Sequence, residues 1–569
     1  MSARSRRTNC SFGCVARPLL KLPPMQTALV IDAIVVAVYF AVIVGIGLRA
    51  GRGSNNLQEF TLGGHKIPWW AVLASIIAAE TSAATFLGAP AEGFKTRSFA
   101  YAQLAIGTVI ARFIIAYLFI APYYRHKVQS IYEFLDQRFG PRTRNMASAI
   151  FLVTRVLGIG VRLYLGGVII VVIWRYLYPG APITLGTYFW GILFTTVVTT
   201  LYTAVGGIKA VVWTDLIQAC LMIGAIFFAI GAVFFSIPGG WETVSASLAA
   251  NPGAGMFQTG WDATKPFGEA LKQMLETPYT IFAAIIGSTI FTMATHGTDQ
   301  DMVQRLLTAE NPAKAKRSLI VSGFADIPIV LGFLAIGLLL AIHYETTPDP
   351  NLPAQHNEVF AYYIVNEMPV VIRGLIVAGV FATMMGSTSA ALNALATSFT
   401  KDFYMPYLGG DKASDAKAVS VARIATAVFG ALMVGVATAA AYAVLQTNIT
   451  IIPLALGILG YSYGSLLGVF LLGMLTASRG SDRANVIAML AGIVSVLIFC
   501  RVKVPALDLR ALVRGELVPQ EWAFGALLPA WWPAIAWPYY VLIGTIGTVA
   551  VAALFRTPKR SIAGKSALP

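Results

Sequence analysis

Long apolar runs recur along the whole 569-residue chain, with only short polar segments between them. A helix that crosses a bilayer needs about 20 mostly apolar residues. On this criterion the sequence predicts about thirteen spans, near residues 27–48, 68–94, 98–122, 146–174, 184–203, 211–236, 278–298, 319–343, 369–400, 419–445, 450–476, 484–500 and 534–555. The pattern therefore predicts an all-α polytopic membrane protein.

The composition supports this interpretation and argues against an enzyme. Hydrophobic residues make up 57% of the chain and charged residues 12%, whereas about 25% charged residues is typical of soluble domains. The sequence has no HExxH, GxSxG or phosphate-loop motif, and its five histidines do not cluster. The expected partners are the lipid bilayer and a small-molecule solute, with neither nucleic acid nor an obligate protein partner indicated.

Basic residues follow the predicted loops unevenly, which predicts the orientation. With the first N-terminus outside, 22 Lys and Arg fall in cytoplasmic segments and 9 in the opposite loops. Cytoplasmic loops carry the excess of Lys and Arg. We therefore expect a multi-pass protein of the inner (plasma) membrane, with its N-terminus outside and its C-terminus in the cytoplasm. The excess of Lys and Arg in the cytoplasmic loops also explains the net charge of +15, so this charge does not indicate a nucleic-acid partner.

Residues 1–24 do not fit this orientation. They carry five basic residues and no acidic residue, yet they would lie outside. Because Met25 directly precedes the first span, a misassigned start codon would explain the conflict. The alternative is a targeting peptide, but the apolar stretch is too short for a signal sequence. We expect a non-native or disordered extension.

Ionisable residues inside predicted spans are candidates for function, because each costs about 2.5–3.5 kcal/mol on insertion scales and so should face the protein interior. These residues are Glu80, Arg112, Arg155, Arg162, Asp215, Asp326, Arg373, Asp402 and Arg423. Arg373 and Arg423 lie near span ends, where a long side chain can reach the interface. Glu80 and Arg162 lie deep inside their spans.

Two spans contain many small and hydroxylated residues. Residues 78–90 read AAETSAATFLGAP, with a carboxylate and a later Gly and Pro, and residues 383–393 read TMMGSTSAALN. The first pattern predicts a helix that unwinds near its middle. Unwound carbonyls at mid-membrane can hold Na⁺ in transporters.

Several motifs resemble those of the sodium/solute symporter family. The most distinctive is GGIKAVVWTDLIQ at residues 206–218. GTDQ at 297–300, VQR at 303–305, DFY at 402–404 and GSLLGVFLLG at 464–473 follow in the family's order. The resemblance implies a LeuT-type fold with two inverted five-helix repeats and the solute between discontinuous helices.

The family arrangement divides the chain into an extra helix and loop at 25–66, a first repeat at 67–236 and a second repeat at 237–476. Two extra helices and a cytoplasmic tail follow at 477–569. Our predicted spans agree with this arrangement, because one predicted helix precedes the ten helices of the two repeats and two predicted helices follow them.

The resemblance also implies where co-transported sodium binds. The motifs match the family's common sodium ligands to Ala78, Thr81, Thr383, Gly386 and Ser387. Gly386 departs from the pattern, because the family usually has a hydroxyl there. A second sodium site of some members matches Asp215 and Ser389, although Ala390 lacks the remaining oxygen.

The solute is less clearly indicated. Positions that resemble sugar contacts in sodium/galactose relatives read Thr85, Leu104 and Thr292 in place of Gln, Glu and Asn, which disfavours a sugar. Glu80 and Thr295 complete the candidate solute contacts. Arg162 suits a carboxylate, because its guanidinium can form a bidentate pair, and Arg155 is the fallback. Alternatively, Glu80 simply neutralises Arg162.

The leading hypothesis is a sodium-coupled symporter that imports a small organic solute, with a carboxylate or related anion favoured. A proton-coupled carrier that uses Glu80 stays open. A membrane sensor is disfavoured, because only about 14 residues follow the last predicted span.

Overall fold

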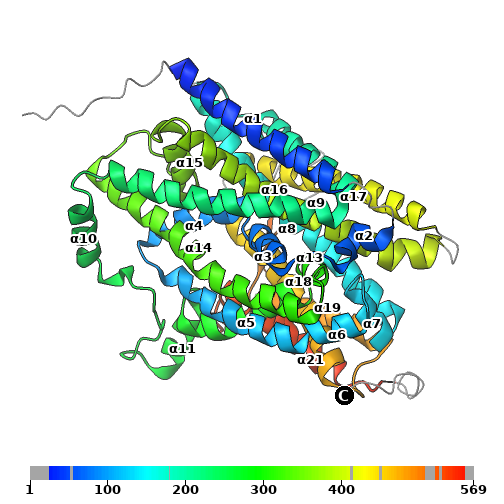
Figure 1. Ribbon diagram of the computed structural model, residues 1–569. Coiled ribbons are helices and arrows are strands. Elements are labelled where there is room, and N and C mark those ends of the chain that lie inside the picture. The colour runs from blue at the N-terminus through cyan, green and yellow to red at the C-terminus, as the bar shows by residue number, and fades with distance from the viewer. Residues whose placement is uncertain are drawn as a thin grey trace, which may run out of the picture.

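The protein is almost wholly helical (Figure 1). The computed structural model describes residues 25–51, 56–178, 180–409, 414–447, 451–506, 520–523 and 528–557. The expectation for residues 1–24 lies outside these ranges.

The longer helices run across the body, and shorter elements join them at either end. The longer helices are α1 (Met25–Ala50), α3 (Trp69–Glu80), α4 (Ala83–Thr96), α5 (Leu104–Leu118), α8 (Pro141–Leu177), α9 (Leu185–Ser236), α14 (Pro312–Thr346), α16 (Ile372–Ser398), α17 (Asp415–Thr447), α18 (Ile451–Leu475), α19 (Asp482–Phe499) and α21 (Tyr540–Ala552). The shorter elements are α2 (Leu57–Leu62), α6 (Ile120–Arg125), α7 (Tyr132–Arg138), α10 (Trp241–Ala250), α11 (Phe267–Glu276), α12 (Thr289–Gly297), α13 (Gln300–Leu307), α15 (His356–Asn366), and the π-helices η4 (Ala283–Ser288) and η5 (Phe399–Gly409). Strands β1 (Lys503–Ala506) and β2 (Gln520–Ala523) form an antiparallel pair that the sequence did not predict.

The expectation of an all-α polytopic membrane protein is confirmed, whereas fewer than the predicted thirteen or so spans meet, as single helices of the described residues, the length and hydropathy needed to cross a membrane. Nine helices there are long and apolar enough to cross a membrane, or ten if the bent pair α3 and α4 counts as one span. The predicted spans at 184–203 and 211–236 both lie in the 52-residue element α9, which consists of two helices joined by a kink at Gly207, where φ is 56° and ψ is −150°. In the predicted span at 278–298, η4 continues directly into α12, and the predicted span at 534–555 contains α21, which has 13 residues.

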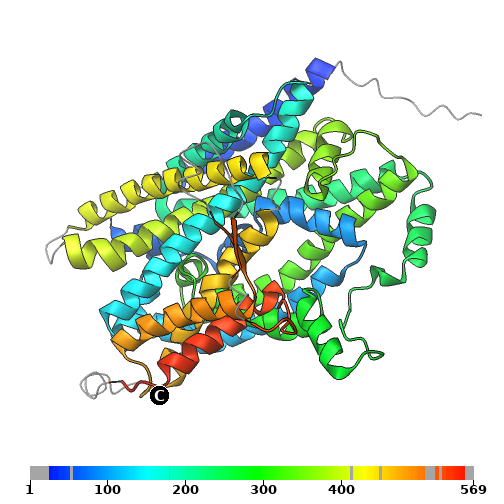
Figure 2. The same cartoon turned by 180° about the vertical axis from the view of Figure 1, so that it is seen from behind.

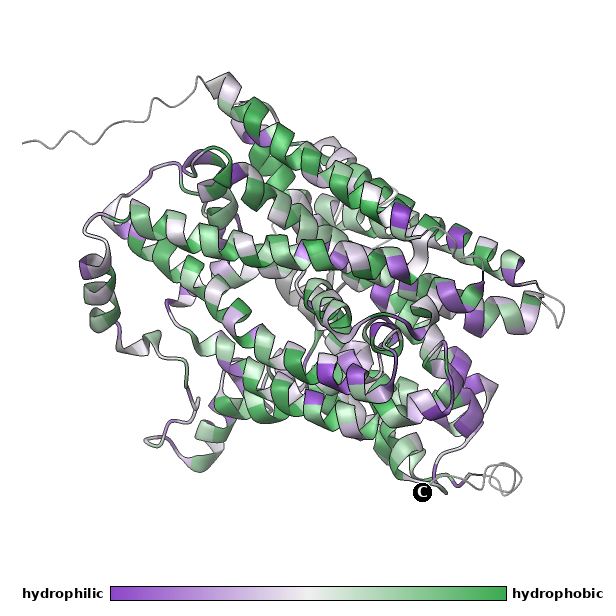
Figure 3. Cartoon of the chain, viewed as in Figure 1, coloured by the Kyte–Doolittle hydropathy of each residue, from purple (hydrophilic) through white to green (hydrophobic). Residues whose placement is uncertain are grey.

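The two ends of the body carry different short elements. Figure 1 shows α10, α11 and α15 at the end where α1 begins, and α2, α6 and α7 at the end where the C-terminus lies. The view from behind in Figure 2 shows the same separation. Apolar residues follow the long helices, and hydrophilic residues gather at the end with α7 (Figure 3).

Small residues let the helices around the interior approach closely. A Cβ added to Gly337 of α14 would lie 1.9 Å from the carbonyl oxygen of Pro90 in α4, and one added to Gly107 of α5 would lie 2.0 Å from that of Ala284 in η4. Glycine at these positions allows backbones to pack directly against each other, as in other membrane helix pairs. These close pairs surround the interior cavity described below.

Arg373 does not extend to the interface, as its position near a span end led us to expect. Its guanidinium is buried and donates from Nε to Asp32 of α1, at 2.6 Å. This ion pair fixes α1 to α16. Arg423 is exposed.

Candidate functional site

A break between α3 and α4 lies at the centre of the candidate site. Thr81 (φ −84°, ψ 102°) and Ser82 (φ −94°, ψ 168°) are extended, and the two helices are bent by 63°. The N–H of Thr81 still donates to the carbonyl of Ile77. The last carbonyls of a helix lack intrahelical donors, so the break leaves oxygens in the interior. The predicted unwinding of this helix is confirmed.

The middle of α16 faces this break. A Cβ built on Gly386 would lie 3.2 Å from the carbonyl oxygen of Ala78 and 2.9 Å from Oε1 of Gln218 on α9. Gln218 is buried, and its Oε1 accepts no hydrogen bond from the described residues. Gly386, the α16 position that lacks the usual hydroxyl, therefore lies close to two oxygens from other helices.

The other α16 candidates are buried and hydrogen-bonded to their own helix. Ser387 donates to the carbonyls of Thr383 (3.0 Å) and Met384 (3.2 Å), and Ser389 donates to that of Gly386 (3.0 Å). A hydroxyl that donates its proton to a backbone carbonyl keeps its lone pairs for a cation. This arrangement is therefore compatible with cation binding.

Asp215 is already engaged by other side chains. Its Oδ2 accepts hydrogen bonds from Ser75 at 2.6 Å and from Nη2 of Arg305 at 3.2 Å. Its Oδ1 is buried and has no hydrogen-bond partner among the described residues. Only one oxygen of this carboxylate is thus left for an ion.

A cavity of about 220 Å³ adjoins the break. Its walls come from α3, α4, α5, α8, η4, α12, α13, α14 and α18, from the 3-10 helix η2 (Ala100–Gln103), and from η7 (Trp537–Tyr539), which precedes α21. This volume lies below the roughly 300–1,000 Å³ that pockets for drug-sized ligands occupy. The cavity therefore suits a small solute.

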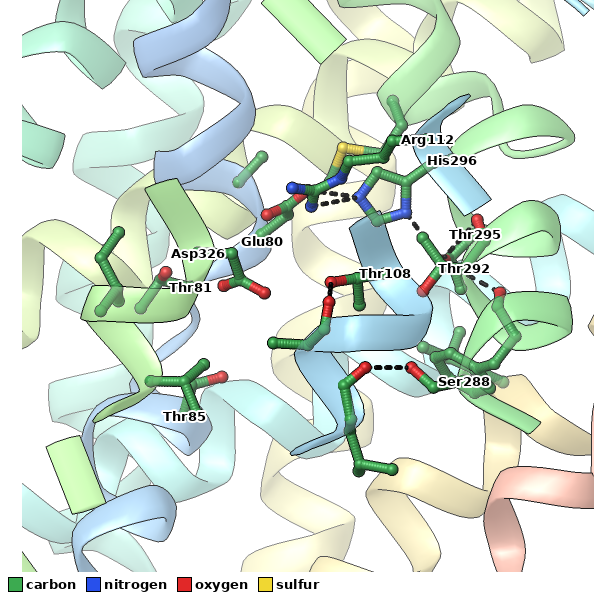
Figure 4. A pocket seen from close by; sticks show the side chains of 18 of the residues that line it. Glu80, Thr81, Thr85, Thr108, Arg112, Ser288, Thr292, Thr295, His296 and Asp326 are labelled. Atoms are coloured by element: carbon green, nitrogen blue, oxygen red, sulfur yellow. Dashed lines mark hydrogen bonds and ion pairs between the residues drawn. The ribbon is translucent and has the colours of Figure 1, made fainter. Parts of the chain in front are cut away.

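Glu80 lies at one end of the cavity in a cluster with two basic side chains (Figure 4). One of its carboxylate oxygens accepts hydrogen bonds from Nη2 of Arg112 on α5 and contacts Nε2 of His296 on α12. Glu80 is therefore not the counter-charge of Arg162, as the alternative interpretation had it. It joins the broken helix to the two elements opposite.

Arg162 lines the cavity without an acidic partner. It makes no hydrogen bond or ion pair with any described residue, and its side chain is partly exposed. The fallback candidate Arg155 also lines the cavity, but its guanidinium forms ion pairs with Asp299, at 3.3 Å, and with Asp301. Of these two arginines, Arg162 is the one available to an anion.

The threonine candidates all line the same cavity. Thr85 lies in the first turn of α4, with its Oγ1 3.5 Å from the hydroxyl of Ser82. Thr292 and Thr295 lie on α12, and Oγ1 of Thr295 lies 2.9 Å from Nδ1 of His296. Thr295 therefore helps to orient the histidine that contacts Glu80.

Four residues of the site were absent from the predicted contacts. Arg112 and Asp326 had appeared only as ionisable residues within spans, and Gln218 lay unremarked at the end of the most distinctive motif. His296 had no sequence signal beyond its place directly before a matched motif. Figure 4 shows the carboxylate of Asp326 directed toward the open space beside Thr108.

Comparison with known proteins shows to which family the chain belongs. The sodium:solute symporter family model matches residues 60–492, which is more than half of the chain. A sodium/sialic acid symporter of Proteus mirabilis is 28% identical over 463 residues, which cover 81% of this chain and 87% of that protein. A sodium/glucose cotransporter of Vibrio parahaemolyticus is 30% identical over 420 residues, which cover 70% and 73%. A sodium-coupled monocarboxylate transporter 2 of Danio rerio is 26% identical over 566 residues, which cover 92% and 83%.

A solved structure supports the fold. A Na⁺-coupled sialic acid symporter in a substrate-bound, outward-open state matches with a TM-score of 0.74 at 24% identity, covering 92% of this chain and 97% of that one. The expected family is confirmed, and so is the expectation of a transporter and not an enzyme. The chain belongs to the sodium:solute symporter family and is a multi-pass membrane protein that couples sodium to the movement of a solute.

Proposed function

We propose that this symporter imports a small organic carboxylate together with sodium by alternating access. The observation that carries the proposal is Arg162, a cationic side chain in the cavity without an acidic partner among the described residues. A guanidinium forms bidentate, charge-assisted pairs with carboxylates. The N-terminal turn of α4 adds a positive helix-dipole end on the same cavity, near Thr85.

Sodium binds, in this proposal, between the break in α3 and the middle of α16. The carbonyls of Ala78 and Thr81, the carbonyl of Thr383 and the hydroxyl of Ser387 are the proposed ligands. The family pattern supports this set, and so does the short distance between Ala78 and the Gly386 position. Oε1 of Gln218 supplies the oxygen that Gly386 lacks, because it is buried, unpaired among the described residues and directed at the same place.

A second sodium at Asp215 and Ser389 has weaker support, since Arg305 and Ser75 already engage one oxygen of that carboxylate. Solute contacts in the proposal are Arg162, Thr85, Thr292, Thr295 and the Glu80 cluster. The proposed orientation keeps the N-terminus outside and the C-terminus in the cytoplasm, with residues 67–236 and 237–476 as inverted repeats. The start of α1 and the position of α21 toward opposite ends of the body support the placement of the two termini on opposite sides.

The test is uptake by proteoliposomes of a panel of labelled carboxylates, sugars and amino acids, with and without an inward sodium gradient. We expect accumulation of a carboxylate-bearing solute only with the gradient. Accumulation of sugars alone, or of carboxylates without sodium, would refute the proposal.

Arg162→Lys tests the solute contact. It keeps the charge but removes the bidentate geometry, so half-saturation by the carboxylate should rise about tenfold or more, the loss expected for a hydrogen bond between charged groups. Arg175→Lys is the matched control, because Arg175 lies on the same helix, is exposed and pairs with Glu358 away from the cavity. Equal effects of the two substitutions would remove Arg162 from the site.

Proton coupling at Glu80 is the second candidate. It has one supporting observation, the contact between Glu80 and His296, which gives the carboxyl group a neighbour that can exchange a proton. The Discussion gives the test that separates it from sodium coupling.

A further inference from the structure

The charges that line the cavity point to a solute with two charges of opposite sign. Arg162 is the positive charge without an acidic partner. Asp326 on α14 is its negative counterpart, because it lines the same cavity and forms no hydrogen bond or ion pair with the residues that the structure describes. The two side chains do not pair with each other.

The neighbouring Arg112 attracts Asp326 but forms no ion pair or hydrogen bond with it among the described residues. The stem of Arg112 packs against α14 one turn earlier, where a Cβ on Gly323 would lie 2.9 Å from its Cδ. Its guanidinium nevertheless donates to Glu80, and its Nε and Nη1 have no partner within the described chain. Asp326 therefore lies near the guanidinium of Arg112, which is already bound to Glu80.

The local charge balance leaves one negative charge at this end of the cavity. Glu80 and Asp326 are two carboxylates, and Arg112 is the one guanidinium beside them. His296 contacts the same oxygen of Glu80 that Arg112 does, and its other ring nitrogen meets Thr295. With His296 in its neutral form, one negative charge would remain uncompensated even if Arg112 were shared between both carboxylates. Burying an unpaired charge is costly, so an occupant that brings a cation is favoured there.

Arg162 carries a positive charge without an ion pair among the described residues, so an occupant that brings an anion is favoured beside it. Arg155, on the same helix, is compensated by Asp299 and Asp301, so those aspartates do not leave a free oxygen pair for Arg162 as well. A solute carboxylate at Arg162 and a solute ammonium at Asp326 would each replace water with a charged partner. A solute with a carboxylate alone would satisfy Arg162 and be repelled by Asp326.

We infer that the transported carboxylate is a zwitterion, with its carboxylate on Arg162 and its ammonium group on Asp326. This inference rests on the proposed function, and it assigns Asp326 as the residue that selects amino-carboxylates over simple carboxylates. A cavity volume of about 220 Å³ suits a small amino acid or a betaine-like compound.

The experiment uses sets of ligands with matched skeletons. Each set holds an amino-carboxylate with its amine on C2, C4 or C6, the same carboxylate without the amine, and the same amine without the carboxylate. Inhibition of sodium-driven uptake by the full chain in proteoliposomes gives an affinity for each compound. We expect the zwitterion of at least one set to bind about ten- to a hundredfold better than both partial analogues, the range for one hydrogen bond to a charged group.

Asp326→Asn should abolish this preference. The zwitterion should weaken by about ten- to a hundredfold, while the simple carboxylate should bind at least as well as to the wild type, because the repulsion is removed. A misfolded protein cannot show the second effect. Asp262→Asn is the matched control, since Asp262 is partly exposed in the loop before α11, away from the cavity, and accepts hydrogen bonds from Thr264.

The outcomes separate this inference from the function on which it rests. Sodium-driven uptake of simple carboxylates without any preference for zwitterions would overturn the inference and leave the proposed function in place. So would an Asp326→Asn protein that weakens both classes equally, or one that keeps the preference and loses only the pH dependence of uptake. Absence of sodium-driven uptake for every carboxylate, zwitterionic or not, would overturn the proposed function itself.

Discussion

A single methyl group at Gly386 should raise the sodium concentration needed for transport. In Gly386→Ala the new Cβ would lie 2.9 Å from Oε1 of Gln218 and 3.2 Å from the carbonyl oxygen of Ala78. The glutamine side chain can move, but the Ala78 carbonyl is backbone. The substitution must therefore separate α3 from α16 or displace the Gln218 oxygen, and either change weakens the proposed sodium site.

The size of the effect follows from the cost of overpacking. Extra methyl groups in a well-packed interior cost about 1–3 kcal/mol, and a difference of this size changes an affinity about 5- to 150-fold. Gly386→Ser introduces the same Cβ together with a hydroxyl oxygen that can bind sodium. The half-saturating sodium concentration should therefore rise from wild type to Ser to Ala, in that order.

Sodium-dependent uptake in proteoliposomes measures this order, and the sodium-induced rise in Tm of the purified protein provides an independent check. Gly435→Ala is the matched control, because Gly435 lies within α17 and a Cβ there would meet no atom within 4 Å. Wild-type sodium dependence in Gly386→Ala would refute the site. Equal values for Ser and Ala would refute the argument that position 386 lacks a sodium ligand.

Two further predictions concern residues beside the break in α3. Ser387→Ala should raise the half-saturating sodium concentration while leaving the Tm without sodium close to that of the wild type, and an unchanged sodium dependence would exclude Ser387 as a ligand. Glu80→Gln should lower the Tm measurably, because removing one partner of a buried ion pair costs about 3–5 kcal/mol and leaves Arg112 without its carboxylate. A flattened pH dependence of uptake in Glu80→Gln would support proton coupling, whereas an unaltered pH profile with a lower Tm would identify Glu80 as a structural counter-charge of Arg112 and His296.

The sequence predicted the helical class and the broken helix because both depend on local patterns. Apolar runs of span length reveal membrane helices, and the run AAETSAATFLGAP shows where one of them unwinds. The number of spans depends instead on irregular points within helices. A positive φ at Gly207 divides α9 into two helical segments, and the π-helix η4 leads directly into α12. Hydropathy alone does not show where such irregular points lie.

The pairing of charges could not be read from the sequence, because it depends on contacts between distant segments. Glu80 and Arg162 were the two deepest ionisable residues of their spans, so a pair between them was reasonable. The fold instead brings Arg112 to Glu80 across 32 positions and His296 across 216. Arg162 is left without an ion pair among the described residues as a result, and the candidate solute site follows from that difference.

A chain of buried ion pairs connects the cavity with the candidate sodium site. Arg155 lines the cavity and pairs with Asp299 and Asp301. Asp301 also pairs with Arg305, which continues to Asp215 on α9.

Within this chain three aspartates face two arginines, and Arg162, on the same helix as Arg155, is a third cation close to Asp299 and Asp301. Removal of one partner from the chain would leave a buried charge uncompensated. The ion-pair network therefore contributes to closing the interior around α13, and it joins the wall of the cavity to the helix that carries Gln218.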